Sequence, residues 1–186
     1  HRPFTYPAGR IRIPNDSKSR AGGVLYSDYS LGRFFAEAAR QPWFENTIFL
    51  VTADHCASSA GRTEIPLQKY HIPALILAPG LIEPGVVDGI VSQIDLMPTL
   101  LSLLNMSYDS HFYGRSIFDP AYVNRAFIAI YQDLGYLEGD TFTILSPVRR
   151  FEQYRVVPTE ENPHHLEAME RKDAVQVDRA IGYYQT

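Results

Sequence analysis

The sequence predicts an α/β fold in which a mixed β-sheet is flanked by helices. Segments with helical and strand-like patterns alternate up to about residue 104, and such alternation is typical of α/β architecture. A β-hairpin pattern follows within residues 126–146, which adds antiparallel strands. With 186 residues, the chain has the length of one ordinary domain and can bury a core of its own.

The first predicted element is a helix over residues 24–40. Residues 1–23 contain three prolines and read as loop. The helix is favoured by apolar residues that recur on one helical face. These are Val24, Leu31, Phe34, Phe35 and Ala38. Pro42 ends the helix because the residue before a proline avoids the α region.

Two short apolar runs predict buried strands. Residues 47–53 are rich in β-branched and aromatic side chains and too few for a typical helix. Residues 71–78 form the second run, which stops at a Pro-Gly pair. A further extended piece is predicted at 86–91.

A second helix is predicted from Ser92 to about Leu104. Ser92 is a good N-cap, and Asp95 stands three residues later as a short capping-box acid. Leucines are spaced for the core at 96, 100, 103 and 104, and Asn105 suits the position after the helix end.

The last third of the chain predicts a hairpin, a strand and a helix. The hairpin pairs residues 126–131 with 141–146, joined across the glycine-containing segment 132–140. Residues 151–157 read as one more strand, and residues 165–184 have helical spacing.

Composition and charge argue against a nucleic-acid partner, a membrane span and an internal disulfide. The net charge of −4 gives no reason to expect nucleic acid as a partner. No apolar run approaches the roughly 20 residues of a membrane span. The single cysteine, Cys56, rules out an internal disulfide.

The strand at 47–53 ends in an acid and a histidine, Asp54 and His55. Ligands collect at the carboxyl ends of strands in open α/β sheets. Adjacent carboxylate and imidazole groups suit Zn²⁺ or Mn²⁺. In the alternative interpretation Asp54 caps a turn and His55 is an ordinary loop residue, and two residues alone do not decide between these.

Six short sequence motifs occur in an order that is typical of one protein family. They are residues 1–7 (HRPFTYP), 26–32 (YSDYSLG), 53–61 (ADHCASSAG), 70–73 (YHIP), 78–80 (APG) and 92–101 (SQIDLMPTLL). Together they resemble the C-terminal part of a sulfatase-type domain in the lipoteichoic-acid-synthase-like branch of the alkaline phosphatase superfamily. The resemblance covers residues 1–150, and it predicts that 1–186 are the C-terminal part of one catalytic domain.

The resemblance implies a metal-dependent enzyme that transfers phosphoryl, phosphoglycerol or phosphoethanolamine groups or hydrolyses phosphate esters. It implies that Asp54 and His55 bind one divalent ion, Mn²⁺ or Zn²⁺, with Mg²⁺ or Ca²⁺ as alternatives. His1 is expected to contact the substrate phosphate and to take part in catalysis. The implied location is the outer side of a bacterial inner membrane, anchored by a segment absent from this chain, with a phosphate or sulfate ester or a phospholipid head group as substrate.

Two further residues are candidate substrate ligands. His71 begins a strand near the predicted site, where it either binds substrate or hydrogen-bonds to the backbone. Arg62 follows the Asp54–His55 pair and either binds an anion through its guanidinium fork or stays solvated. Cys56 is expected to be a small buried thiol rather than a ligand.

Three alternatives follow for the function. The first is the phosphotransferase or phosphate-ester hydrolase, whose nucleophile and first carboxylate ligand lie before His1 in the family. The second is a true sulfatase, and the third is a non-catalytic binding module with the same fold. Because even catalytic zinc sites normally have three protein ligands, we expect this chain alone to be inactive and to bind metal weakly.

Overall fold

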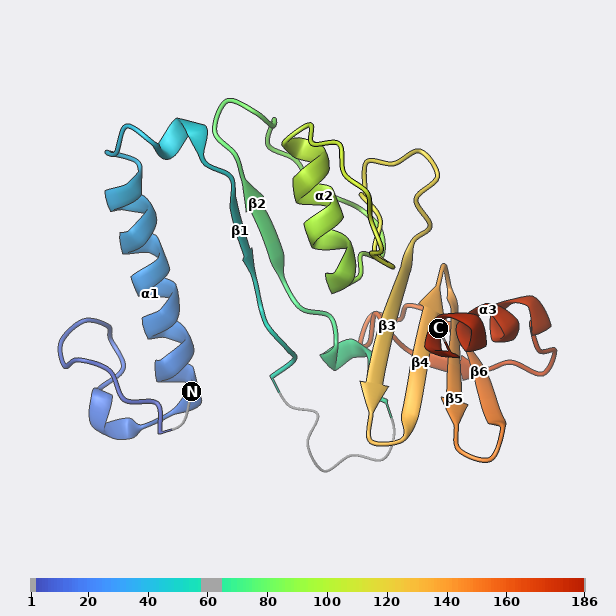
Figure 1. Ribbon diagram of the computed structural model, residues 1–186. Helices are drawn as coiled ribbons and strands as arrows, with labels where there is room; N and C mark the ends of the chain where they lie inside the picture. Colours follow the sequence, from blue (N-terminus) through green and yellow to red (C-terminus); the bar gives the residue numbers. More distant parts are fainter. Residues whose placement is uncertain (1–2, 58–64, 186) are drawn as a thin grey trace. The chain divides into compact units, whose positions relative to one another are not determined.

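The computed structural model describes residues 3–57 and 65–185. Internal contacts divide the chain into two compact units. One comprises residues 1–49 and 77–82, and the other comprises residues 50–76 and 83–186. The predicted α/β class is confirmed, because helices accompany two sheets, one of two strands and one of five. Figure 1 shows the elements along the chain.

The first unit is built around helix α1 (Arg20–Ala38), which begins four residues earlier than predicted. Ser19 is its N-cap and accepts a hydrogen bond from the backbone N–H of Gly22, a local signal that the apolar pattern did not reveal. The predicted core face is only partly right, because Ala38 is buried whereas Val24 is 65% exposed.

An aromatic cluster joins the end of α1 to the first residue of strand β1 (Phe49–Thr52). The ring of Phe49 makes edge or tilted contacts with four other rings, at centroid distances of 5.3–6.2 Å. These belong to Phe34, Phe35, Trp43 and Phe44. Such ring pairs stabilise packing beyond the area they bury. The ring contacts of Phe49 therefore fix the position at which β1 starts.

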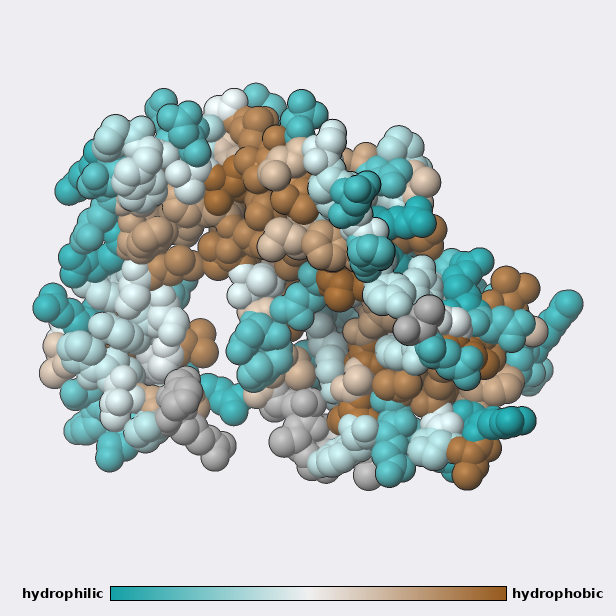
Figure 2. Space-filling model, in the orientation of Figure 1, coloured by the Kyte–Doolittle hydropathy of each residue, from teal (hydrophilic) through white to brown (hydrophobic). Residues whose placement is uncertain are grey.

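Strand β1 pairs with β2 (Ala74–Leu77), and both predicted strands are therefore present. Their predicted burial was wrong, because β1 is half-buried and the first two residues of β2 are exposed. Residues 86–91, predicted as an extended piece, do not pair as a strand in either sheet. Figure 2 shows hydrophobic residues gathered over β2 and the following helix α2 (Leu96–Leu103). Leu75, Met97 and Leu104 are each about half exposed. Clustered exposed apolar residues usually mark a contact surface.

Helix α2 follows the 3-10 turn η4 (Gln93–Asp95), and the predicted capping box is confirmed. The Asp95 carboxylate accepts a hydrogen bond from the Ser92 N–H at 3.1 Å. Asn105 has a φ of 51°, the left-handed conformation expected just after a helix. Leu96 is buried as predicted, but Leu104 faces solvent.

The C-terminal part forms a five-stranded antiparallel sheet in the order β3-β4-β5-β6-β7. Its strands are β3 (Arg125–Ile130), β4 (Asp133–Glu138), β5 (Thr141–Ser146), β6 (Arg150–Val156) and β7 (Leu166–Ala168). The predicted hairpin was wrong in one respect, because β4 occupies the segment read as a connection. The helix predicted over 165–184 was wrong in its first half, which contains β7.

Helix α3 (Ala174–Gln185) packs on this sheet (Figure 1). Asp173 caps it by accepting a hydrogen bond from the Gln176 N–H. Below the helix, the buried side chains of Thr143, Gln153 and Gln176 hydrogen-bond to one another, so the polar groups under α3 are satisfied. On the sheet itself, an apolar cluster that includes Ile128, Leu137 and Phe142 forms the core.

Among residues 3–57 and 65–185, no helix is both long enough and apolar enough to cross a membrane.

Candidate functional site

Asp54 and His55 lie directly after the β1 strand, with highly exposed side chains. Asp54 Oδ1 accepts a hydrogen bond from the His55 backbone N–H at 3.0 Å. The His55 Nδ1 lies 2.7 Å from the carbonyl oxygen of Cys56. Because a carbonyl oxygen only accepts, Nδ1 carries the proton. In the neutral ring, Nε2 is then the free lone pair, which is the form that binds a metal.

The free ends of these two side chains face each other. His55 Nε2 and Asp54 Oδ2 are 3.6 Å apart. Two acceptor atoms at this distance repel unless a cation lies near both, either a proton on Nε2 or a metal ion. Because Zn²⁺ binds nitrogen and oxygen at about 2.0–2.2 Å, both atoms can reach one ion. The donor set therefore fits a divalent metal.

The described residues contain only part of a ligand set. No group of three or more His, Cys, Asp or Glu side chains that could hold a metal is found within 3–57 and 65–185. Asp54 and His55 would thus be two ligands of a site that needs at least one more from protein. Cys56 is a half-buried free thiol.

The backbone that carries the Asp54–His55 pair is held from two sides. The Gln93 side chain donates through Nε2 to the carbonyl oxygens of Ala53 and Asp54, at 3.0 and 3.2 Å. The Pro73 carbonyl accepts from the Thr52 hydroxyl at 3.1 Å. Gln93 was missed by the sequence analysis, because nothing in its immediate neighbours connects it with residues 39 and 40 positions away.

The structure places His71 beside His164. Their rings meet edge to face with centroids 5.4 Å apart. Burial, together with the neighbouring His71, lowers the pKa of His164. The Nδ1 atom of His164 is buried and has no hydrogen-bond partner among the residues that the structure describes. His71 joins no three-ligand metal cluster in the described segments, and its role as a substrate ligand stays a prediction.

The predicted site residues His1 and Arg62 lie outside the described residues. Their roles in substrate binding, and that of His1 in catalysis, stay predictions.

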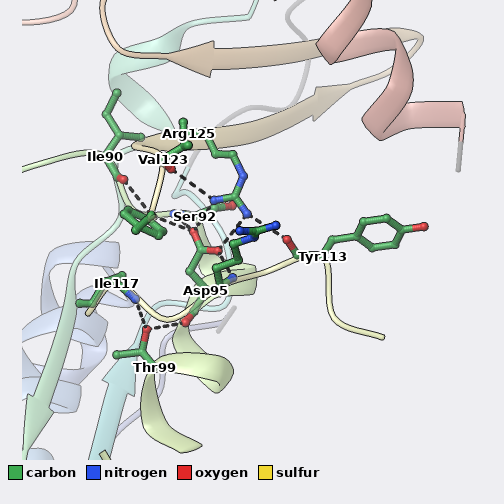
Figure 3. A network of polar contacts seen from close by, with 10 residues as sticks. Ile90, Ser92, Asp95, Thr99, Tyr113, Ile117, Val123 and Arg125 are labelled. Carbon is green, nitrogen blue, oxygen red and sulfur yellow. Dashed lines mark hydrogen bonds and ion pairs between the residues drawn. The ribbon is translucent and has the colours of Figure 1, made fainter. Parts of the chain in front are cut away.

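A buried ion pair that the sequence analysis missed lies close by in the same unit. Asp95 is fully buried, and its carboxylate pairs with the guanidinium of Arg125 at 3.2–3.3 Å. It also accepts from the hydroxyl of Tyr122 and the backbone N–H of Arg115. Figure 3 shows Arg125 reaching this carboxylate, with Thr99 bonded to the backbone beneath it. Only the capping role of Asp95 was visible in the sequence.

The pKa values around Asp95 follow from burial and charge. Burial is the largest single effect on the pKa of Arg125 and lowers it, but the interactions with Asp95 and Tyr183 together outweigh burial, so the pKa of the guanidinium is raised. Burial and the negative charge of Asp95 raise the pKa of Tyr122. Arg125 therefore stays charged and Tyr122 stays a neutral phenol, and the hydrogen-bonded network serves to hold structure.

Comparison with known proteins identifies the family. The sulfatase family model matches residues 4–106, more than half of the chain. The chain belongs to the sulfatase family. The matched range contains the Asp54–His55 pair and Gln93.

Two relatives show how much of a whole protein the chain represents. An arylsulfatase from Clostridium perfringens (strain 13 / Type A) is 30% identical over 107 residues, which is 53% of this chain and 22% of the relative. A crystal structure of a protein in the alkaline phosphatase superfamily from Vibrio parahaemolyticus matches with a TM-score of 0.87 and 32% identity. That match covers 100% of this sulfatase-family chain and 47% of the Vibrio protein. The chain therefore spans less than half the length of either relative.

Proposed function

We propose that this sulfatase-family chain supplies two metal ligands, Asp54 and His55, to an enzyme that transfers phosphoryl or phosphoglycerol groups or hydrolyses phosphate esters. The observation that carries the proposal is the 3.6 Å approach of His55 Nε2 and Asp54 Oδ2. Their other polar atoms, Nδ1 and Oδ1, are engaged with backbone groups. The two free atoms are thus already oriented toward a common point.

A divalent ion bound there, Mn²⁺ or Zn²⁺, would neutralise negative charge on the group being transferred. The residues of this chain hold the two ligands in position before the ion binds. The Cys56 carbonyl holds the imidazole in the tautomer with a free Nε2, and Gln93 steadies the backbone beneath the carboxylate. Preorganised ligands of this kind need little rearrangement when the ion binds.

The remaining ligands and the nucleophile are proposed to come from a segment that precedes His1. Support comes from the two-ligand set of the described residues and from relatives more than twice the length of this chain. We therefore expect the 186-residue chain alone to bind metal weakly and to lack phosphotransfer activity. In the same proposal the longer protein is anchored to a bacterial inner membrane and acts outside the cytoplasm, on a phosphate ester or a phospholipid head group.

Hydrolysis of a sulfate ester is the second candidate function. The likeness to the Clostridium perfringens arylsulfatase favours it. The two candidates differ in the reacting atom, phosphorus or sulfur, and not in the use of Asp54 and His55.

The test compares two variants of the full-length protein, Asp54→Ala and His55→Ala, with two controls. Asp109→Ala and His111→Ala make the same changes at exposed residues of a loop. We expect the first two to lose most of the bound metal, measured by elemental mass spectrometry, and both controls to keep it. Full metal content in Asp54→Ala would refute the proposed ligand role.

Activity then separates the two substrates. The full-length protein is assayed with p-nitrophenyl phosphate and p-nitrophenyl sulfate in parallel. Faster hydrolysis of the phosphate ester supports the first candidate, and faster hydrolysis of the sulfate ester supports the second. Activity that survives loss of the metal would contradict both.

A further inference from the structure

A pocket of about 220 Å³ lies in the C-terminal part of the second unit. Side chains from the loop before β3, from β3, from β4 and from α3 line it. They are Arg115, Ala121, Val123, Arg125, Tyr136, Arg179 and Tyr183. Neither Asp54 nor His55 lines this pocket.

The pocket is positively charged. Three of its seven lining residues are arginines, and none is acidic. Two of the guanidinium groups have carboxylate partners, since Arg125 pairs with Asp95 and Arg179 pairs with Glu138. The exposed side chain of Arg115 makes no ion pair in the part of the chain that the structure describes. Three positive charges against two negative ones leave one positive charge unbalanced.

The walls of the pocket are fixed in advance. The guanidinium carbon of Arg125 lies 5.8 Å from the ring centre of Tyr183, in addition to its contacts with Asp95. Glu138 accepts a hydrogen bond from the Tyr136 hydroxyl at 2.8 Å while it pairs with Arg179. A ligand would therefore have to order mainly the Arg115 side chain, so the side-chain part of the entropic cost of binding is small.

The place of Arg115 is also determined by the fold. The Asp95 carboxylate accepts its backbone N–H at 2.9 Å. Gly114 before it lies so close to the Ile94 carbonyl that a Cβ atom would come within 1.9 Å of the oxygen. This close approach sets where the Arg115 side chain leaves the backbone to line the pocket.

We propose that this pocket binds a small oxyanion, a phosphate or sulfate group, either free or as the head of a monoester. Guanidinium groups bind such oxygens through paired N–H donors. Tyr183 and Val123 would face the few organic atoms of an ester. The pocket is smaller than the roughly 300–1,000 Å³ typical of drug-sized ligands, which limits the ligand to an oxyanion with a short substituent.

The test measures phosphate binding by the full-length protein with isothermal titration calorimetry. Ionic strength is held constant with sodium chloride, and EDTA removes any contribution of bound metal. We expect saturable binding of inorganic phosphate that Arg115→Gln weakens at least tenfold. Arg150→Gln is the matched control, because it removes the same charge from an exposed position on β6, and it should leave the affinity unchanged.

Circular dichroism establishes that both variants are folded. Absence of saturable binding in the unaltered protein would overturn the proposal, as would equal affinity in Arg115→Gln. Because metal is absent throughout, the result does not depend on the proposed function.

Glycerol 1-phosphate and methyl sulfate extend the titration. Tighter binding of an ester than of the free anion identifies a monoester head group as the ligand. Equal affinities identify the free oxyanion.

Discussion

Replacing Asp95 with Asn is expected to destabilise the second unit severely. Asp95 is fully buried, and its two oxygens accept hydrogen bonds from Ser92, Arg115, Tyr122 and Arg125. Asparagine has nearly the same shape but carries no charge. The variant would leave Arg125, which is only 2% exposed, as a buried cation without a counter-charge.

The expected loss in the free energy of unfolding is about 3–5 kcal/mol, the usual cost of removing one partner from a buried ion pair. Three of the five hydrogen bonds reach a single oxygen, Oδ2, and the amide nitrogen of Asn cannot accept them. Whichever way the amide turns, at least two donors lose a partner. Because a whole domain is stable by only about 5–15 kcal/mol, this loss is readily measured.

Urea unfolding of the full-length protein, followed by circular dichroism, measures the effect. Arg155→Gln is the control, since the Arg155–Asp140 pair is about half exposed and such surface pairs contribute about 1 kcal/mol or less. The double variant Asp95→Leu/Arg125→Met should recover much of the loss, because replacing both partners with apolar groups avoids the unpaired charge. A cost for Asp95→Asn no larger than that of the control would refute this reasoning.

Three further outcomes are expected. Gly114→Ala should lower the free energy of unfolding by about 3 kcal/mol, the upper end for overpacking, because the new Cβ would lie 1.9 Å from a backbone oxygen. Gly182→Ala, where an added Cβ would meet no atom of another described segment within 4 Å, should not lower the stability measured in urea, and equal losses of stability in the two variants would contradict the packing argument. The lowered pKa of His164 means that the unfolded chain binds the proton more readily, so stability should fall as the pH drops below about 6.5. The free energy of unfolding, measured in urea between about pH 7.5 and 5.5, should change less with pH in His164→Gln than in the unaltered protein. His111→Gln should leave this pH dependence unchanged, and an identical pH dependence in all three proteins would be inconsistent with this origin. Gln93→Ala should weaken metal binding to the full-length protein by about 10–100-fold, as loss of supporting hydrogen bonds around ligands does, and an unchanged affinity in a metal titration would exclude that support.

The features predicted correctly from the sequence are those with local causes. Strands β1 and β2 appear as short apolar runs bounded by turn residues, and the capping box at Ser92 and Asp95 requires only four neighbouring residues. Asn105 adopts its left-handed conformation because it directly follows a helix. The Asp54–His55 pair was likewise evident, since both residues follow a short apolar strand.

The features that sequence reasoning missed depend on distant parts of the chain. Gly135 suggested a connection, yet it lies within β4 opposite Ile144, at a point where Phe142 leaves no space for a side chain. Residues 166–168 become a strand because β6 offers them an edge to pair with. The Asp95–Arg125 pair joins residues 30 positions apart. No local pattern shows which of several arginines will be buried beside which acid.

The 3-10 turn at residues 93–95 links the candidate metal ligands to the C-terminal sheet. Gln93 supports the backbone of Asp54, and Asp95, two residues later, holds Arg125 at the start of β3. The capping box fixes the turn itself. A change at Asp95 should therefore have two consequences, lower stability and weaker metal binding, because it loosens the turn that positions Gln93. A change at Asp54 removes a proposed ligand whose side chain is exposed, so it should abolish metal binding and leave stability nearly unaltered. The two kinds of variant thus separate the residues that bind the ion from the structure that positions them.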